Sequence, residues 1–314
     1  GLKQANAVVA IGFDDAPLIT MSYQSPRKLN IPSGAKVLKV MVAPEDGEPP
    51  SPPVRSVPAR RPVKEKIPIH HLGATDSPPL PGQPWRIHDR YRPRPKVVQP
   101  GETPDAPPSD ATILFDGQGL DAWCHHGEED LWYVPMWLVE DDQLVVEPHT
   151  GSLYTIDSFG SCQFHLEWMI PEGTKGNSQG RGNSGIKFME LYEVQILDSF
   201  SNRTYADGQA GAIYGQYPPL VNAVKPQGQW QVYDIFFEAP KFEGEELVRP
   251  AYLTVLLNGL LVQNHRQLAG PTGARAPVYR PGTPAAPIML QDHGNRIRFR
   301  NIWVRELPDD ASHR

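Results

Sequence analysis

After residue 110 the sequence is divided into many short apolar segments, each of which ends at a turn. Clusters of Gly, Pro, Asn and Asp separate the segments, and none continues into an amphipathic helix longer than two turns. They lie at residues 112–117, 137–139, 143–146, 152–155, 163–168, 186–189, 192–197, 231–238, 251–257, 260–263, 288–290 and 297–307. Short strands without helices are typical of a sandwich or barrel, and about 195 residues suit two sheets. The sequence therefore predicts an all-β fold, a two-sheet antiparallel jelly-roll sandwich over residues 110–308.

One dipeptide predicts where two of these strands meet. Asn258-Gly259 lies between the apolar runs at residues 251–257 and 260–263. Both residues tolerate a positive φ, which a two-residue hairpin turn requires. We therefore expect a β-hairpin with its turn at these two residues.

Proline is concentrated before this body, since 21 of the 35 prolines precede residue 110. Because proline fixes φ and has no amide donor, residues 46–109 are predicted to form an extended Pro/Arg-rich arm. Residues 1–45 are predicted to be an N-terminal segment with short strands at residues 7–11 and 36–42. Residues 309–314 form a tail.

The arm is basic although the whole chain is acidic. Residues 54–96 carry ten Lys/Arg and three Asp/Glu, whereas the net charge of the chain is −6. Such an arm could fold back onto the acidic body or bind an acidic partner, either a protein assembly or a membrane surface. Nucleic acid is not expected, because the basic residues alternate with proline and match no recognition module.

The two cysteines, Cys124 and Cys162, are too few for a disulfide framework or a four-ligand zinc site. One bridge could form if they face each other on neighbouring strands. The alternative is that they are two small buried apolar residues.

Polar side chains interrupt the apolar strand at residues 192–197. Because side chains alternate between the faces of a strand, Glu193 and Gln195 share one face, and Tyr192 and Val194 share the other. A carboxylate and an amide on one face of a sandwich fit the floor of an open groove that binds sugars. The alternative is that Glu193 is a surface acid paired with an arginine.

Residues close to this strand extend the candidate site. Asn183 stands in the run GNSGI at residues 182–186, for which a simple turn is the alternative. Tyr214 lies in a long polar loop at residues 205–215, and such loops often line a site. Asp198 and Asp207 could bind a hard cation, although their spacing matches no calcium loop.

A second polar block, QDHG at residues 291–294, lies in a turn between two strands and begins with Gln291. His293 is a natural proton carrier near neutral pH, and Asp292 could orient it; a purely conformational role is the alternative. Arg300 on the next strand could pair with Glu193 or bind a substrate oxygen. No nucleophile elbow, phosphate loop, dinucleotide fingerprint or zinc motif is present, which disfavours acyl transfer, phosphoryl transfer and nicotinamide chemistry.

Taken together, these blocks resemble the 3-keto-disaccharide hydrolase family, whose members share a concanavalin A-like jelly roll with many lectins and glucanases. The chain departs from the family pattern at Leu191, where Gly is frequent, and at Gln229, where the family often has Glu. The similar segments are PWRIHD at 84–89 and residues 114–117, 164–168, 182–186, 192–199, 204–216, 218–222, 230–240 and 291–305.

The resemblance implies action on glycosides whose C3 hydroxyl has been oxidised to a ketone. The ketone acidifies the C2 proton, so that a base can remove it, the C1 substituent leaves, and water adds back. Glu193 or His293 would be the base and the other the acid. A divalent cation or amide donors could stabilise the enediolate. The residues implied to hold the sugar are Asn183, Gln195, Tyr214, Gln291, Asp292 and Arg300.

An exported protein, periplasmic or extracellular, is expected on this basis. Residues 5–13 are too short and too poorly flanked for a signal peptide, so a targeting segment would lie outside this sequence. The alternative function is a noncatalytic carbohydrate-binding or scaffold subunit. Its arm would dock it into a larger assembly, which could be peripheral to a membrane.

Overall fold

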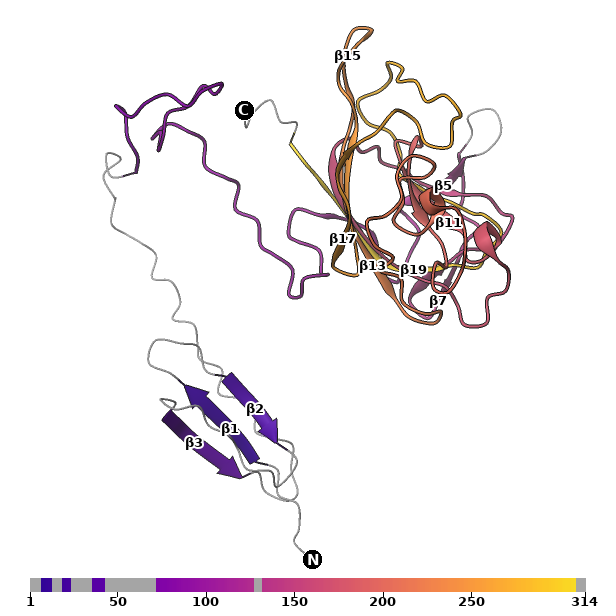
Figure 1. Ribbon diagram of the computed structural model, residues 1–314, viewed down its shortest axis with the longest axis horizontal. Coiled ribbons are helices and arrows are strands. Elements are labelled where there is room, and N and C mark those ends of the chain that lie inside the picture. Colours follow the sequence, from indigo (N-terminus) through magenta and orange to yellow (C-terminus); the bar gives the residue numbers. More distant parts are fainter. Residues whose placement is uncertain (1–6, 13–18, 24–35, 43–71, 127–131, 309–314) are drawn as a thin grey trace, which may run out of the picture. The chain divides into compact units, whose positions relative to one another are not determined.

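A computed structural model describes residues 7–12, 19–23, 36–42, 72–126 and 132–308. The chain divides into two compact units, Gly1–Gly73 and Ala74–Arg314. In the first unit, β1 (Ala7–Gly12), β2 (Ile19–Tyr23) and β3 (Lys36–Val42) form an antiparallel sheet in the order β2-β1-β3 (Figure 1). The strands predicted at residues 7–11 and 36–42 are confirmed, and β2 is additional. The predictions for residues 46–71 and for the tail at 309–314 lie outside the described residues.

Two antiparallel sheets make up most of the second unit (Figure 1). The larger sheet has eight strands in the order β17-β16-β13-β10-β19-β8-β7, with β4 also paired to β19: β4 (Thr112–Phe115), β7 (Leu138–Glu140), β8 (Gln143–Val145), β10 (Cys162–Met169), β13 (Gln231–Glu238), β16 (Tyr252–Leu257), β17 (Leu260–Gln267) and β19 (Arg298–Glu306). The smaller sheet has six strands in the order β12-β11-β18-β9-β5-β6: β5 (Trp123–His126), β6 (Trp132–Tyr133), β9 (Leu153–Thr155), β11 (Ser184–Phe188), β12 (Tyr192–Ile196) and β18 (Met289–Leu290).

The inner faces of the two sheets pack around aromatic side chains. Phe188 of the smaller sheet contacts Phe164 and Phe237 of the larger one, with ring centroids 5.6 and 5.0 Å apart. All three rings are fully buried. Burying each such side chain contributes about 1.5–3 kcal/mol, so these contacts hold the sheets together. The predicted all-β jelly-roll sandwich is confirmed, and the described residues contain no α-helix. No helix among them is long and apolar enough to cross a membrane.

The predicted hairpin is confirmed in the larger sheet. Leu257 pairs with Leu260, and Asn258 and Gly259 form the turn with φ of 54° and 76°. Two successive positive φ values give a turn whose twist matches that of the flanking strands. The Asn258 side chain also joins the turn to β13, because its Oδ1 accepts a hydrogen bond from the Val232 amide at 2.9 Å.

The structure contains strands that the apolar pattern did not predict. β5 has the sequence WCHH, in which two histidines hide the alternation, and β6 is only two residues long. A separate ribbon of β14 (Lys241–Glu243) and β15 (Glu246–Arg249) is rich in charged residues. The side chains of β14 and β15 lie mostly at the surface, and Trp123, Cys124 and His125 of β5 are all buried, so none of these strands shows the apolar alternation of a half-buried strand.

The two cysteines do not form a bridge. Cys124 lies on β5 of the smaller sheet and Cys162 on β10 of the larger one, and both are free and buried. Burial raises the pKa of both thiols. The bridge alternative is therefore wrong, and the interpretation as small buried residues is confirmed.

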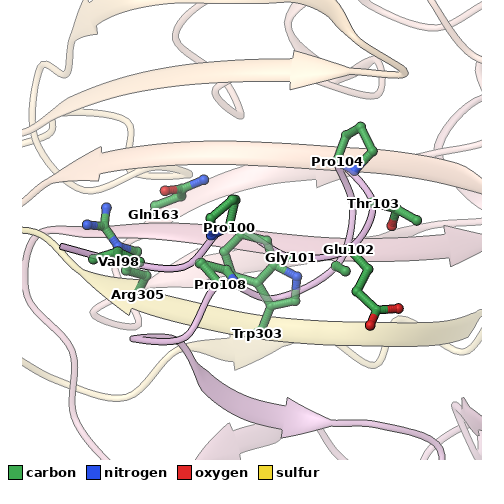
Figure 2. Close-up of a pocket in the computed structure, with 11 residues that line it drawn as sticks. Val98, Pro100, Gly101, Glu102, Thr103, Pro104, Pro108, Gln163, Trp303 and Arg305 are labelled. Carbon is green, nitrogen blue, oxygen red and sulfur yellow. The ribbon is translucent and has the colours of Figure 1, made fainter. Parts of the chain in front are cut away.

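Residues 96–110, which we call the strap, fold back onto the outer face of the larger sheet. The Asp105 carbonyl oxygen accepts hydrogen bonds from Asn301 Nδ2 at 2.9 Å and Trp303 Nε1 at 3.1 Å. At the end of the strap, Arg305 Nε donates to Asp110 Oδ1 at 2.8 Å. Figure 2 shows Trp303 between the strap and β19, beside a cavity of about 580 Å³ that Pro100 and other strap residues line. The strap thus docks on the sandwich, but the basic residues at 54–96 make none of these three hydrogen bonds, so the fold-back alternative for that basic segment stays a prediction.

Candidate active site

The polar floor of the candidate site is the outer face of β12. Tyr192, Val194 and Ile196 point into the core between the sheets. Glu193 and Gln195 therefore lie on the opposite face, as the strand alternation predicts. Both are nonetheless buried, at 5% and 1% exposure, because loops cover this edge of the smaller sheet. A buried carboxylate on an outer sheet face is costly, which marks the position as a candidate functional site.

The Glu193 carboxylate lies against the neighbouring strand β11. A Cβ atom added to Gly185 would be 2.5 Å from Glu193 Oε1, so the carboxylate occupies the space that a side chain would fill. Lys187 pairs with Glu193 across the two strands, and its Nζ is 3.6 Å from Glu193 Oε2. The missing side chain at Gly185 and the cation at Lys187 together set the position of the carboxylate.

The environment of Glu193 changes its acidity. Burial raises the pKa of the Glu193 carboxyl above its usual range, because the charged form loses hydration. The positive charges of Lys187 and His293 lower this pKa but do not cancel the effect of burial. A carboxylate with a raised pKa is a stronger base than an exposed one, so Glu193 is suited to proton abstraction.

The Gln195 side chain is held by two neighbouring amides. Its Nε2 donates to Asn183 Oδ1 at 3.0 Å and to Gln179 Oε1 at 3.1 Å. Asn183 Nδ2 in turn donates to the Gln179 carbonyl oxygen at 2.8 Å. These bonds fix the orientation of the Gln195 amide, and within the described part of the chain its Oε1 has no donor. A buried acceptor without a partner is uncommon in folded proteins, which distinguishes this position from an ordinary surface amide.

Tyr214 stands beside Glu193 on the side away from β11. Val194 pairs with Ile213 in an antiparallel bridge, and the Tyr214 amide donates to the Glu193 carbonyl oxygen at 3.1 Å. Tyr214 is therefore the cross-strand neighbour of Glu193, with its side chain on the same face. The hydroxyls of Tyr214 and Tyr205 are 2.6 Å apart. Both rings line a cavity of about 590 Å³.

The second polar block lies on the other side of Glu193. The Gln291 amide donates to the Gly185 carbonyl oxygen at 2.9 Å, so the segment that follows β18 lies beside the carboxylate. His293 is exposed in this segment and close enough for its charge to act on Glu193. Asp292 does not orient the imidazole as we expected. Its carboxylate accepts hydrogen bonds from the backbone amides of Gly151 and Gly294, which fix the turn.

Arg300 is not part of this face. It lies on β19 of the larger sheet, where its Nε donates to Glu167 Oε2 at 2.7 Å. Its guanidinium also stacks over Trp230 at 4.1 Å from the ring centroid. The alternative pairing of Arg300 with Glu193 is therefore wrong, because the two residues belong to different sheets and the partner of Arg300 is Glu167.

The two aspartates considered as cation ligands have separate surroundings. Asp198 is paired with Arg181, whose Nε is 2.8 Å from Asp198 Oδ2, and it also accepts a hydrogen bond from Gln227. Asp207 instead lines the cavity beside Tyr214. Within residues 72–126 and 132–308, no three His, Cys, Asp or Glu side chains are grouped to hold a metal ion.

Three residues of this face were missed in the sequence. Lys187 had a usable signal, because a short turn at residues 189–191 places it opposite Glu193 in a hairpin. Tyr205 lies in the loop that was expected to line a site, but its approach to Tyr214 depends on the loop path. Gln179 belongs to a short 3-10 helix, η3 (Ser178–Gly180), and nothing in its local sequence indicates a contact with Gln195.

Replacing Gly185 by Ala is expected to reduce activity without unfolding the protein. The new methyl group would displace the Glu193 carboxylate, and a small misplacement of a catalytic group costs about 10-fold or more in rate. Steady-state kinetics measure the loss, and circular dichroism checks the fold. Gly282→Ala is the matched control, because Gly282 is exposed and no atom lies within 4 Å of its added Cβ. Full activity of Gly185→Ala would contradict this placement of Glu193.

Comparisons with known proteins agree with this architecture. The family model of the 3-keto-alpha-glucoside-1,2-lyase-like domain matches residues 110–305. A crystal structure of a candidate glycosyl hydrolase from Parabacteroides distasonis is 42% identical to this chain, with a TM-score of 0.64; the match covers 69% of this chain and 94% of that one.

Two further structures are more distant. Another candidate glycosyl hydrolase from Parabacteroides distasonis is 21% identical, with a TM-score of 0.45, over 63% of this chain and 94% of its own. The carbohydrate-binding module CBM66 from Bacillus subtilis is 11% identical, with a TM-score of 0.33, over 59% of this chain and 96% of its own. No curated protein matched the sequence.

Proposed function

The chain belongs to the 3-keto-alpha-glucoside-1,2-lyase-like family, and we propose that it cleaves glycosides whose C3 hydroxyl has been oxidised to a ketone. Its glycoside hydrolase or lyase-like character follows from the family. In the proposed reaction the C3 ketone acidifies the C2 proton, a base removes that proton, and the substituent at C1 leaves by elimination. Water then adds to the unsaturated sugar.

Glu193 carries this proposal. It is a buried carboxylate with a raised pKa, held in place by Gly185 and Lys187 and next to Tyr214, which lines a cavity. Proton abstraction next to a ketone needs one positioned base, whose pKa should lie near the working pH. Burial raises the pKa of the Glu193 carboxyl toward neutral pH, which supports the role of Glu193 as the base.

The residues around Glu193 fit the remaining tasks. His293 is close enough to interact with the carboxylate, and as the acid it would donate to the ketone oxygen as charge develops there. Gln195 and Asn183, with Gln291 at the edge of the groove, would hold the sugar. Arg300 has no part in this site.

A conventional glycosidase mechanism is the alternative, and it needs two carboxylates on either side of the glycosidic bond. Asp207 is the second carboxylate to consider, because its charge and that of Glu193 both act on Tyr205. The two mechanisms differ in one requirement. Only the proposed reaction depends on the ketone at C3.

The test compares methyl 3-keto-glucoside with unoxidised methyl glucoside. In heavy water, we expect the C2 proton of the keto sugar to exchange in its NMR spectrum and an absorbing enone to form. The unoxidised glycoside should show neither change. Equal cleavage of both compounds would reject the proposal in favour of the two-carboxylate mechanism.

We propose further that the protein is exported, to the periplasm or the cell exterior, as expected for an enzyme that meets glycosides outside the cytoplasm. The basic residues at 54–96 support a second proposal, in which an acidic protein assembly or membrane surface binds this part of the chain. Weakening of such binding by increasing salt would support it.

A further inference from the structure

We infer that the hydroxyl pair of Tyr205 and Tyr214 is the acid that protonates the leaving oxygen at C1, and that the leaving group occupies the adjoining cavity. This inference rests on the proposed function. It assigns a catalytic task to Tyr205, which the sequence analysis placed only in a loop expected to line a site, and it assigns to Tyr214 a task other than sugar binding.

The order of the groups across the groove supports this assignment. His293 follows β18, Gly185 and Lys187 lie on β11, Glu193 lies on β12, and Tyr214 follows on the segment paired with β12. In the substrate the ketone carbon C3, the acidic carbon C2 and the carbon C1 are consecutive. A sugar with C2 over Glu193 and its ketone toward His293 therefore directs the C1 oxygen toward Tyr214.

The two hydroxyls form one polarised donor. At 2.6 Å one hydroxyl donates to the other, so the accepting hydroxyl keeps its own proton for an outside acceptor. The donated bond strengthens that second donor. Burial, the bond to Tyr214 and the charges of Tyr214, Asp207 and Glu193 raise the pKa of Tyr205, so it remains protonated in the resting protein. The pair is adjacent to the base, because Tyr214 is the cross-strand neighbour of Glu193 and its amide donates to the Glu193 carbonyl oxygen at 3.1 Å.

The cavity on the far side of the pair has room for a leaving group. It measures about 590 Å³, and its lining includes Tyr205, Tyr214, Asp207 and Arg275. The segment 273–275 of the lining is tied to the site strand through the preceding residue, because the Glu193 amide donates to Thr272 Oγ1 at 3.0 Å. Aromatic rings with a few polar groups are the usual lining of sites for sugars and other ring compounds. The tyrosine pair thus stands between the base and the space for the departing group.

The proposed reaction is an elimination across C1 and C2 of the keto sugar. Glu193 takes the C2 proton, and the electrons of that bond form an enolate with the C3 carbonyl. The enolate electrons then form the C1=C2 double bond and restore the ketone, while the C1–O bond breaks. The outward hydroxyl of the pair gives its proton to the leaving oxygen. Transfer of the proton from Glu193 back to the tyrosinate through water restores the protein.

The test uses two keto glucosides that differ in their need for an acid. The methyl glycoside releases its C1 oxygen as methoxide, which requires protonation, whereas the nitrophenyl glycoside releases nitrophenolate, which is a stable anion. Tyr214→Phe and Tyr205→Phe are each expected to slow release of methanol by about 10²-fold or more and to change release of nitrophenol little. Exchange of the C2 proton in heavy water should continue in both variants, because Glu193 is intact.

Tyr252→Phe is the matched control, since its hydroxyl bonds Gln267 on the larger sheet. It should behave as wild type in every assay, and thermal unfolding will show whether all three variants are folded. Unchanged methanol release in both tyrosine variants would overturn the inference alone. So would equal losses on the two substrates, since the pair would then act in proton abstraction. Absence of C2 exchange in the wild type would instead overturn the proposed function, and the inference with it.

Discussion

Replacing Glu193 by Gln is expected to lower the turnover of 3-keto-glycosides by about 10²–10⁴-fold. The amide keeps the size of the side chain, which lies over Gly185, but it cannot accept the C2 proton. Exchange of that proton with solvent should therefore fall in parallel with product formation. The measurement follows both in one NMR sample with methyl 3-keto-glucoside.

The same substitution is expected to change the pH dependence of stability. The native protein holds the Glu193 proton at pH values at which the unfolded chain has released it, because burial raises this pKa. Stability from this group therefore falls as pH rises from the ordinary glutamate range through the raised native pKa. Glu193→Gln has no proton to release, so urea unfolding of the variant should show a smaller decline over this range.

Glu190→Gln is the matched control for both experiments. Glu190 is exposed at the turn that precedes β12, so its replacement should alter neither turnover nor the pH profile of unfolding. An active Glu193→Gln variant would remove the carboxylate from the mechanism. Residual activity that required His293 would then identify the histidine as the base.

Removing residues 1–109 is expected to destabilise the sandwich by about 2–4 kcal/mol relative to removing only residues 1–73. The shorter deletion ends at the boundary between the two compact units. The longer one also removes most of the strap. Trp303, now 2% exposed, would lose its cover, and Asn301 and Trp303 would lose the Asp105 carbonyl oxygen that both of them bind.

Urea unfolding of the two truncated proteins, followed by tryptophan fluorescence, measures this difference. Trp303→Phe in the protein that retains the strap isolates the indole hydrogen bond and should account for about 1 kcal/mol of it. Equal stability of the two truncated proteins would show that the strap contributes nothing to the fold. The result matters for expression, because the family match begins at residue 110 and invites removal of the strap.

The fold was largely predictable because strand alternation and turn chemistry are local. Asn258-Gly259 predicted a hairpin at the correct residues, and the alternation at residues 192–197 placed Glu193 on the correct face. Strands whose apolar residues do not alternate, such as the histidine-containing β5, were not predicted. The sequence could not show where the strap docks. Its main contact is the backbone carbonyl of Asp105, which any residue could supply, rather than a recognisable side chain.

The site was predictable only in part, because alternation indicates the face of a strand but not the sheet to which that strand belongs. Arg300 was considered as a partner of Glu193, yet it lies on the larger sheet with Glu167. Tyr205 meets Tyr214 through the path of a loop, which no periodic pattern describes. Lys187 is the exception among the missed residues, because its place opposite Glu193 follows from the hairpin register.

The strap also determines how this protein can be attached to a support. It runs on the outer face of the larger sheet, whereas Glu193 opens onto the outer face of the smaller one. The strap is therefore anchored on the face of the sandwich opposite to that of Glu193. A support attached to the residues of the strap itself would therefore lie on the face opposite to that of Glu193, and a polymeric glycoside could reach the Glu193 face from the bulk liquid.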